Sequence, residues 1–344
     1  MRAAVMRGSQ LVVDTVPEPE PATGEMLVRT LACGICGSDL HALTHASKVV
    51  EAAREAGDSP FTMDPSRDVV MGHEFCAEVV DYGPDTTGAF KPGERVVSMP
   101  LLFRGSAIQA IGYSNDVPGG YGELMVLSAG LALPVPNGLS TEHAALTEPM
   151  AVGLHAVEKA HMEPHDAALV IGCGPVGLAV IAALRLRGTE PIIASDLSPR
   201  RRALGERMGA HAVVDPHQRP IIDAYREIAD LRPVVVFECV GIPGMLRDIM
   251  RHAPHGARIV VAGVCMDDDT IRPLVGINKE LSLQFVLGYT PFEFQDTLAA
   301  IADGRIDVSP LVTGSVGVEG VAQAFRDLAT PEQHAKILVE PWRS

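Results

Sequence analysis

The sequence predicts a two-domain α/β plus β protein, in which a barrel-like β domain is joined to a domain built around a parallel sheet. Its 344 residues exceed one ordinary hydrophobic core, because domains average roughly 150 residues. A hydrophobic content of 47% and a charged content of 21% allow large buried cores and exclude disorder or coiled coil as descriptions of the whole chain. The pattern of apolar segments changes at about residue 149, where we expect the domain boundary.

Short β segments separated by Pro and Gly fill residues 1–149. Apolar or alternating runs occur at 26–35, 68–83, 94–103 and 122–129. Such closely spaced segments, without helices between them, predict a barrel-like β domain.

Strands and helices alternate along residues 150–288. The expected strands lie within 168–174, 191–196, 210–215, 234–241, 258–264 and 281–288, and the first two helices at 176–187 and 199–208. This alternation indicates parallel strands joined by crossover helices. The last part, 289–344, contains an acidic helix and a final strand, and we assign it to the first domain.

The composition also narrows the choice of partners and location. A net charge of −15 opposes binding to nucleic acid, which relies on Lys and Arg to neutralise phosphates. Six cysteines without a signal segment at the start give no disulfide framework and predict a cytoplasmic location. The uncharged stretch 167–184 contains three glycines and a proline, which predict a strand, turn and helix rather than a membrane span.

The strongest motif is the GCGPVG segment at 172–177, which follows an apolar strand and opens a helix. Gly172 permits the turn, Gly174 lets a pyrophosphate approach the backbone, and Gly177 allows close helix packing. Asp196, at the end of the next strand, suits the adenosine ribose and repels a 2′-phosphate, although the arginines at 200–202 weaken this preference for NAD over NADP. The predicted NAD-binding residues are Gly172, Gly174, Pro175, Val176, Gly177, Asp196 and Arg201.

Three residues far apart in the sequence, Cys36, His73 and Glu148, are candidate metal ligands. A thiolate, an imidazole and a carboxylate supply three protein ligands to a tetrahedral zinc ion and leave the fourth position for a substrate oxygen. Cys76 is a rival ligand, but positions 73 and 76 of a strand face opposite sides, so Cys76 is predicted to lie in the core. Cys33 and Cys36 form a Cys-x-x-Cys pair, yet the βαβ context of a redox motif is missing.

Together these motifs resemble the zinc-dependent medium-chain dehydrogenase/reductase family, especially its alcohol and polyol dehydrogenases. The resemblance runs from LACGICGSDLH and GHE through TEPMAVGLHA and VIGCGPVGL to ASDLSPRRR and FECVG. It implies a GroES-like β-barrel catalytic domain and a Rossmann-type NAD domain. It also implies one catalytic zinc held by Cys36, His73 and Glu148, with Glu74 at its edge as a supporting residue or occasional ligand.

The resemblance further implies roles around the reacting oxygen. Ser38 would contact the substrate oxygen, His41 would pass its proton to solvent, and Asp39 would orient the ligand imidazole. The expected reaction moves a hydride between NAD(H) and an alcohol and its ketone or aldehyde, with a secondary alcohol of apolar body as the favoured substrate. A polyol dehydrogenase of sorbitol or threonine type and a non-catalytic NAD-binding redox sensor are the alternatives.

The sequence departs from the family pattern in two places. Many members carry four cysteines for a structural zinc after the GERV segment, but residues 97–121 contain no cysteine, so we expect a single zinc. The stretch 43–67 is an insertion of partly helical composition, which would serve either as a lid over the substrate or as a surface connection. The apolar segment 281–287 is an edge strand, through which we expect a homodimer or homotetramer to form.

Overall fold

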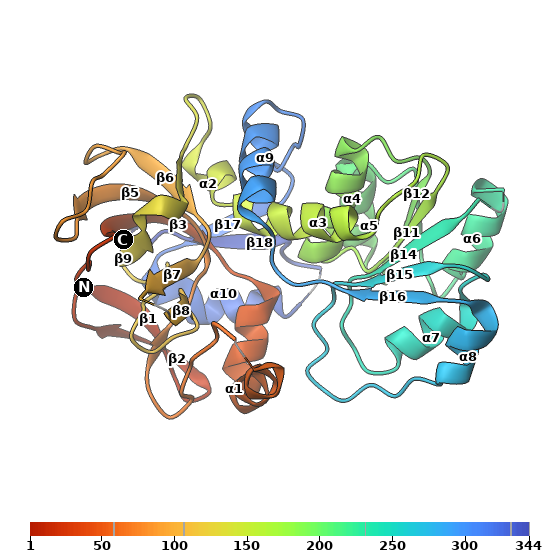
Figure 1. The fold of residues 1–344 in the computed structure, drawn as a ribbon, viewed down its shortest axis with the longest axis horizontal. Helices are drawn as coiled ribbons and strands as arrows, with labels where there is room; N and C mark the ends of the chain where they lie inside the picture. Colours follow the sequence, from red (N-terminus) through yellow and green to blue (C-terminus); the bar gives the residue numbers. More distant parts are fainter. Residues whose placement is uncertain (58, 106, 231, 331, 344) are drawn as a thin grey trace. The chain divides into compact units, whose positions relative to one another are not determined.

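The computed structural model describes residues 1–57, 59–105, 107–230, 232–330 and 332–343, and the chain divides into two compact units (Figure 1). Unit 1 comprises Met1–Glu148 together with the chain from Val312 onward, and unit 2 comprises Pro149–Leu311. Unit 1 is mostly β structure and unit 2 contains a parallel sheet, so the predicted α/β plus β class is confirmed. Among the described residues, no helix has the length and apolar character needed to cross a bilayer.

The described residues of unit 1 form a seven-stranded sheet around a central strand, β3 (Glu25–Gly34). β3 pairs antiparallel with three partners, namely β5 (Glu74–Tyr82), β9 (Leu124–Ser128) and β18 (Lys336–Val339). The sheet is completed by β6 (Arg95–Ser98), β10 (Ala132–Pro134) and β17 (Val312–Val316). Its strands bury Met26, Phe75 and Leu127, which supply the apolar core predicted from the alternating runs.

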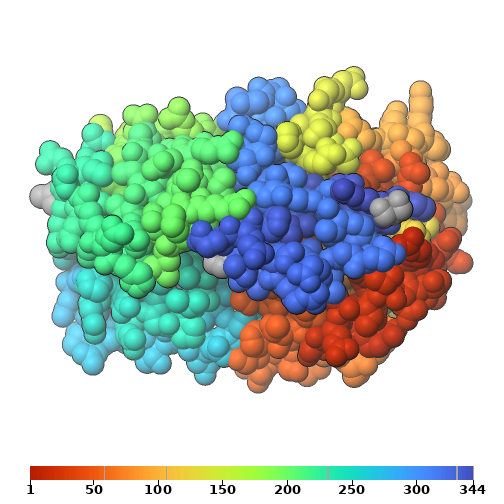
Figure 2. Space-filling model, turned by 180° about the vertical axis from the view of Figure 1, so that it is seen from behind, coloured from red at the N-terminus to blue at the C-terminus, as the bar shows by residue number. Residues whose placement is uncertain are grey.

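The two ends of the chain meet in unit 1. The N-terminal strand β1 (Arg2–Arg7) lies between β2 (Gln10–Thr15) and β4 (Val69–Val70). Arg2 forms an ion pair with Glu319, which precedes α10 (Val321–Leu328), and Figure 2 shows the dark blue C-terminal residues beside the red N-terminal ones. The C-terminal segment is therefore an integral part of this unit.

The remaining elements of unit 1 lie outside its main sheet. β7 (Leu101–Arg104) and β8 (Ala107–Ala110) pair in a small separate sheet, and α2 (Thr141–Ala144) follows the main strands in the sequence. Helix α1 (Gly37–Ala56) begins directly after Cys36, well before the helical composition at 48–57 indicated, and its backbone is kinked at His45. The insertion packs on the core of its own unit, since Val50 and Met63 are buried there. Residue 58 lies outside the described part of this stretch.

The described residues of unit 2 form a six-stranded parallel sheet of strand order β13-β12-β11-β14-β15-β16. The strands are β11 (Ala167–Ile171), β12 (Ile192–Ser195), β13 (Ala212–Val214), β14 (Val234–Glu238), β15 (Arg258–Val261) and β16 (Ser282–Phe285). The order reverses between β11 and β14, and open parallel sheets bind ligands at the carboxyl ends of strands flanking such a point. This is the Rossmann-type topology expected from the alternation of strands and helices.

Seven helices among the described residues belong wholly or mainly to unit 2. They are α3 (Thr147–Lys159), α4 (Pro175–Leu186), α5 (Pro199–Met208), α6 (Ile221–Ile228), α7 (Met245–His252), α8 (Pro273–Lys279) and α9 (Pro291–Ala302). Helix α5 shows why the sequence prediction was accurate there, because Ser198 caps its first turn by accepting a hydrogen bond from Arg201 N–H and Gly209 ends it with a φ of 118°.

The return to unit 1 lies later than residue 289, the boundary expected from the sequence. Helix α9 belongs to unit 2, where His155 of α3 bonds to Glu293 with Nδ1 2.9 Å from Oε2. The capping box of Thr290 and Glu293 fixes the start of α9 beside that contact. The first segment to rejoin unit 1 is β17, which pairs with β18.

Candidate functional site

Cys36 lies at the junction between β3 and helix α1, where it is the N-cap residue. Its backbone N–H donates a 3.0 Å hydrogen bond to Asp39 Oδ2, one turn into the helix. The Cys36 thiol is partly exposed. The local fold therefore presents the Cys36 sulfur at the edge of the main sheet.

His73 immediately precedes β5 and is 8% exposed. Its Nδ1 lies 3.4 Å from Asp39 Oδ1, within ion-pair distance but outside hydrogen-bond geometry. Burial opposes the charged imidazole, but the negative charge of Asp39 outweighs burial and raises the pKa of His73 well above its usual value. Since Nδ1 faces Asp39, Nε2 is the nitrogen left for a metal, and the predicted orienting contact is present.

Asp39 is fully buried and is held by two phenols. Tyr121 donates a 2.6 Å hydrogen bond to Oδ2, and Tyr113 donates a 2.9 Å hydrogen bond to Oδ1. Burial alone would raise the pKa of Asp39, but His73, Tyr121 and the backbone N–H of Cys36 lower it, so the ionised carboxylate is favoured. Burial and the charge of Asp39 raise the pKa of both tyrosines well above the usual value, so both remain proton donors.

Glu74 begins β5 and has a fully buried side chain. Lys336 Nζ, from β18, lies 2.7 Å from Oε1 and 2.6 Å from Oε2 of this carboxylate, and it also donates a 3.1 Å hydrogen bond to the carbonyl of Ile35. Burial would lower the pKa of Lys336, but the charge of Glu74 raises it. The two side chains therefore form a buried ion pair.

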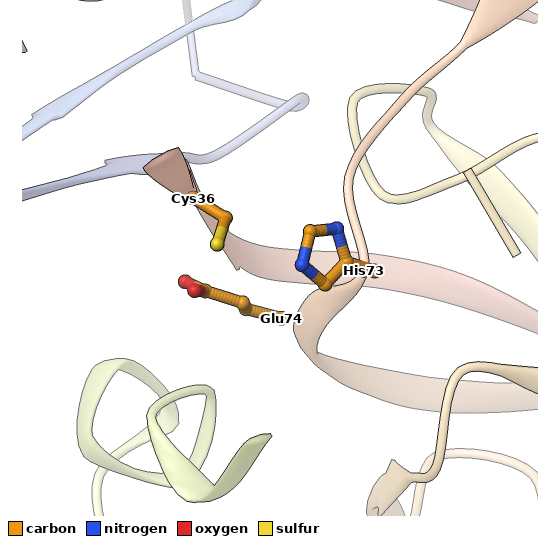
Figure 3. A group of neighbouring side chains, drawn as sticks. All are labelled: Cys36, His73 and Glu74. Carbon is orange, nitrogen blue, oxygen red and sulfur yellow. The ribbon is translucent and has the colours of Figure 1, made fainter. Parts of the chain in front are cut away.

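The structure brings Cys36, His73 and Glu74 together. One ligand atom from each lies within 4.8 Å of the others, and Figure 3 shows a ring nitrogen of His73 and the carboxylate of Glu74 turned toward the Cys36 sulfur. Thiolate, imidazole and carboxylate are the ligand types that zinc takes in proteins. The donor set and the spacing of these three groups fit a zinc ion.

Glu148, the predicted third ligand, lies outside this group of three. It is 8% exposed in the first turn of α3, and its negative charge helps to raise the pKa of Lys336. The carboxylate is thus near the ion pair of Glu74, and its role as a ligand stays a prediction. Cys76 is fully buried on β5, where burial raises the pKa of its thiol to about 12; the prediction that it belongs to the core is confirmed.

The two residues predicted to carry a proton, Ser38 and His41, lie on the first turns of α1. Ser38 Oγ is 2.9 Å from Tyr113 Oη. Burial and the nearby His45 lower the pKa of His41, so a neutral imidazole that can accept a proton is favoured near neutral pH.

The GCGPVG turn of unit 2 has the geometry that the sequence predicted. Gly172 has a φ of 96°, and Gly174 is the N-cap of α4 with Pro175 at its first position. A Cβ on Gly177 would lie only 1.8 Å from the carbonyl oxygen of Gly172, so the turn and helix approach as closely as the motif requires. No side chain caps the N-terminus of α4 at Gly174, which suits a pyrophosphate.

Asp196 supports this turn directly. Its Oδ2 accepts a 2.8 Å hydrogen bond from Cys173 N–H and its Oδ1 accepts one from Ser198 N–H at 2.8 Å. Each oxygen retains a lone pair for a ribose hydroxyl. Arg202 is committed to backbone carbonyls, whereas Arg201 Nη1 lies 4.0 Å from the Cβ position of Gly174. Of the two, Arg201 is the one placed beside the turn.

Sequence reasoning missed Lys336, Tyr113 and Tyr121. Lys336 is the first residue of an otherwise apolar strand. Because a buried lysine needs an acidic partner, this position could have predicted a buried ion pair. The tyrosines gave no signal, because their partner Asp39 is more than 70 residues away in sequence.

The chain is similar to known proteins over its whole length. Residues 22–137 match the alcohol dehydrogenase GroES-like domain, and residues 175–303 match the zinc-binding dehydrogenase family. It is 31% identical to (R,R)-butanediol dehydrogenase of Bacillus subtilis over 96% of each chain. It is 27% identical to sorbitol dehydrogenase of the same organism over 100% of this chain and 98% of the relative.

Solved structures agree with this relationship. A putative zinc-binding dehydrogenase from Sinorhizobium meliloti, bound to NADP, superposes with a TM-score of 0.83 at 26% identity and covers 99% of both chains. The GroES-like and Rossmann-type units, the activity class and the zinc dependence expected from the sequence are thereby confirmed. The chain belongs to the zinc-dependent medium-chain dehydrogenase/reductase family.

Proposed function

We propose that this protein is an NAD-dependent zinc alcohol dehydrogenase that transfers a hydride between NAD(H) and an alcohol and its ketone or aldehyde. The observation that carries the proposal is the grouping of a thiol, an imidazole and a carboxylate within 4.8 Å. The same chain builds a glycine turn at the start of α4, which is the element that binds a dinucleotide pyrophosphate.

Cys36, His73 and Glu148 are the proposed zinc ligands. Glu74 is nearer to the first two, but Lys336 holds both of its oxygens within 2.7 Å. A carboxylate already neutralised by a lysine gains less from binding a cation. Glu74 is therefore proposed to support the site and to act only as an occasional ligand.

Zinc bound here would act as a Lewis acid that stabilises negative charge on the substrate oxygen. Ser38 would contact that oxygen and accept its proton, and His41 lies one turn further along α1. The lowered pKa of His41 suits a group that receives a proton and releases it to solvent. Asp39 keeps the His73 ring in one orientation, with Nδ1 toward the carboxylate.

NAD is the proposed cofactor. The Asp196 carboxylate, which is fixed by two backbone N–H groups, would accept hydrogen bonds from the ribose and repel a 2′-phosphate. Arg201, near Gly174, would pair with the pyrophosphate. The related structure with NADP makes the preference worth measuring in this chain.

A secondary alcohol with an apolar body is the proposed substrate. The Tyr113 ring lies 5.3 Å from the His73 ring, and the Phe61 ring lies 5.3 Å from Tyr113, so apolar surface adjoins a proposed zinc ligand. Pockets with such walls favour apolar groups. A polyol is the second candidate, because one relative is a sorbitol dehydrogenase.

We also propose a homo-oligomer joined at β16 and a cytoplasmic location. β16 ends the parallel sheet of unit 2, and Phe285 and Leu287 beside that edge are 64% and 76% exposed. Pairing of β16 with a second copy would satisfy its free backbone groups and cover these side chains. All six cysteines are free, as is usual in a reducing compartment.

The test is a screen of secondary alcohols, primary alcohols and polyols for NAD reduction by the zinc-loaded protein. We expect turnover that is lost on chelation and restored by zinc, with the highest kcat/KM for an apolar secondary alcohol. Higher kcat/KM for sorbitol-like compounds would favour the polyol candidate. Turnover that survives complete zinc removal would refute the mechanism.

A further inference from the structure

We propose that Tyr113 is a positioning residue of the metal site and that the insertion at 59–67 exists to hold it there. Tyr113 Oη lies 2.9 Å from both Ser38 Oγ and Asp39 Oδ1. It thereby joins the residue proposed to contact the substrate oxygen to the residue that orients His73. This inference rests on the proposed function, but one of its tests does not need turnover.

The number of donors and acceptors on each group determines how Tyr113 bonds to Ser38 and Asp39. A phenol has one proton, and the ionised Asp39 carboxylate can only accept, so Tyr113 donates its proton to Asp39. Tyr113 Oη is also the donor in its 2.9 Å contact with Ser38 Oγ, so its single proton is shared between Ser38 and Asp39. Ser38 keeps its own proton and a lone pair on Oγ, so it can take up the proton of an alcohol as it passes its own proton on, for which His41 is the proposed acceptor.

Tyr113 belongs to the cysteine-free stretch 97–121, and that stretch packs on the backbone beside His73. Gly119 N–H, Gly120 N–H and Tyr121 N–H donate 2.8–3.0 Å hydrogen bonds to the carbonyls of residues 70–72. A Cβ on Gly119 would lie 2.4 Å from the carbonyl oxygen of Gly72, so the two backbones are in close contact. Displacement of this stretch would therefore be felt directly at His73.

The segment 59–67 contacts the other side of the same stretch. Ala110 N–H bonds to the Pro60 carbonyl at 2.9 Å, and the Thr62 and Ser114 hydroxyls are 2.8 Å apart. Asn115 accepts a 2.7 Å hydrogen bond from Asp64 N–H and donates one of 3.0 Å to the Asp64 carbonyl. The bonded residues Ala110, Ser114 and Asn115 flank Tyr113 in the sequence.

The two departures from the family pattern are thus complementary. The stretch 97–121 lacks the cysteines that would fix it through a metal, and the inserted segment supplies hydrogen bonds and the Phe61 to Tyr113 ring contact instead. The insertion therefore acts on catalysis through Tyr113.

The first test is Tyr113→Phe in the zinc-loaded enzyme, which keeps the ring and removes the bridge. We expect kcat to fall roughly tenfold or more, the size of effect expected for a hydrogen bond to a charged group, with KM for the alcohol and zinc content unchanged. In a Ser38→Ala background the same change should lower kcat by a smaller factor than in the parent, because part of the effect of Tyr113 on the rate passes through Ser38. Tyr82→Phe, which removes a 2.9 Å hydrogen bond to the Phe90 carbonyl elsewhere in unit 1, is the matched control and should leave kcat unchanged.

The second test replaces zinc by cobalt and records the visible absorption bands. Tyr113→Phe should shift these bands, because Asp39 holds His73 less firmly, whereas Tyr82→Phe should not. This spectrum decides the inference even if no alcohol is oxidised, an outcome that would refute only the proposed function. Should Tyr113→Phe fail to fold, Asn115→Ala carries both tests, with a shift of the bands and a kcat reduced at least threefold as the expected results.

Three results would overturn the inference. One is a kcat of Tyr113→Phe within twofold of the parent. Another is an equal loss of rate with and without Ser38. The third is a cobalt spectrum of Tyr113→Phe identical to that of the parent.

Discussion

The Lys336 to Glu74 ion pair is the most deeply buried charge pair described in unit 1, and its removal has a calculable cost. The two side chains are 3% and 0% exposed, and Nζ lies 2.6 Å from Oε2. Lys336→Met keeps the aliphatic part of the side chain and removes the charge. Glu74 would then be left buried without the lysine that neutralises it, and the Ile35 carbonyl would lose its hydrogen bond.

Breaking a buried ion pair by removing one partner costs about 3–5 kcal/mol of unfolding free energy. For a domain of this size each kcal/mol corresponds to roughly 2–4 °C in Tm, so we expect a decrease of about 6–20 °C. Glu74→Gln in the Lys336→Met background should recover most of the loss, because no unpaired charge remains. The exposed pair of Arg2 and Glu319, with 46% and 62% exposure, is the control, and Arg2→Met should cost less than about 1 kcal/mol.

Calorimetry and urea unfolding of the zinc-loaded variants measure these differences. A Lys336→Met variant within about 1 kcal/mol of the parent would refute the argument that burial makes this pair costly to break. A double variant less stable than Lys336→Met alone would refute the claim that the unpaired Glu74 is the cause.

Three further outcomes are expected. Parent kcat/KM should favour NAD over NADP by roughly a hundredfold, and Asp196→Ala should narrow that ratio; an unchanged ratio would show that Asp196 does not set it. Glu293→Gln should cost about 1 kcal/mol at pH 7. Burial would raise the pKa of Glu293, but hydrogen bonds from Thr290 and His155 lower it. The ionised carboxylate therefore stabilises the fold at pH values above its pKa in the unfolded chain, and this stabilisation is lost as the pH falls through its pKa in the folded protein. A loss of stability in Glu293→Gln that persists below the folded-state pKa would contradict this pH dependence. Leu287→Glu should convert an oligomer to a monomer of 36.5 kDa in sedimentation, whereas a monomeric parent would remove the basis for the interface.

Local patterns predicted the nucleotide turn well. The glycines at 172, 174 and 177 act through contacts within a few residues, and Pro199, Ser198 and Gly209 mark the ends of α5 through their own backbone preferences. Apolar runs also placed β3, β5, β6 and β9 of unit 1 and the six strands of the parallel sheet of unit 2, whereas β1, β2, β8 and β10 were not predicted. These features depend on short-range sterics and on the spacing of apolar residues, both of which can be predicted from neighbouring residues in the sequence.

Long-range partners were less accessible. Lys336 and Glu74 are separated by 262 residues in the sequence, and Tyr113 and Asp39 by 74. Contacts between residues so far apart depend on how the chain folds as a whole. The early start of α1 was missed because CGSDLH has little helix-forming character, and the cap formed by Cys36 and Asp39 starts the helix instead. The helix α9 was assigned to the wrong side of the boundary, since its His155 partner lies on a helix that begins at residue 147.

The central claim is that zinc held by Cys36 and His73 supports hydride transfer to NAD, and metal analysis joined to turnover tests it most directly. We expect one zinc per chain in the dialysed parent. Cys36→Ala should lose both zinc and NAD reduction while NAD binding persists, and Cys76→Ala, a change at the buried thiol of β5, should retain both. Two zinc ions per parent chain, or a Cys36→Ala variant with parental zinc content and turnover, would contradict the account.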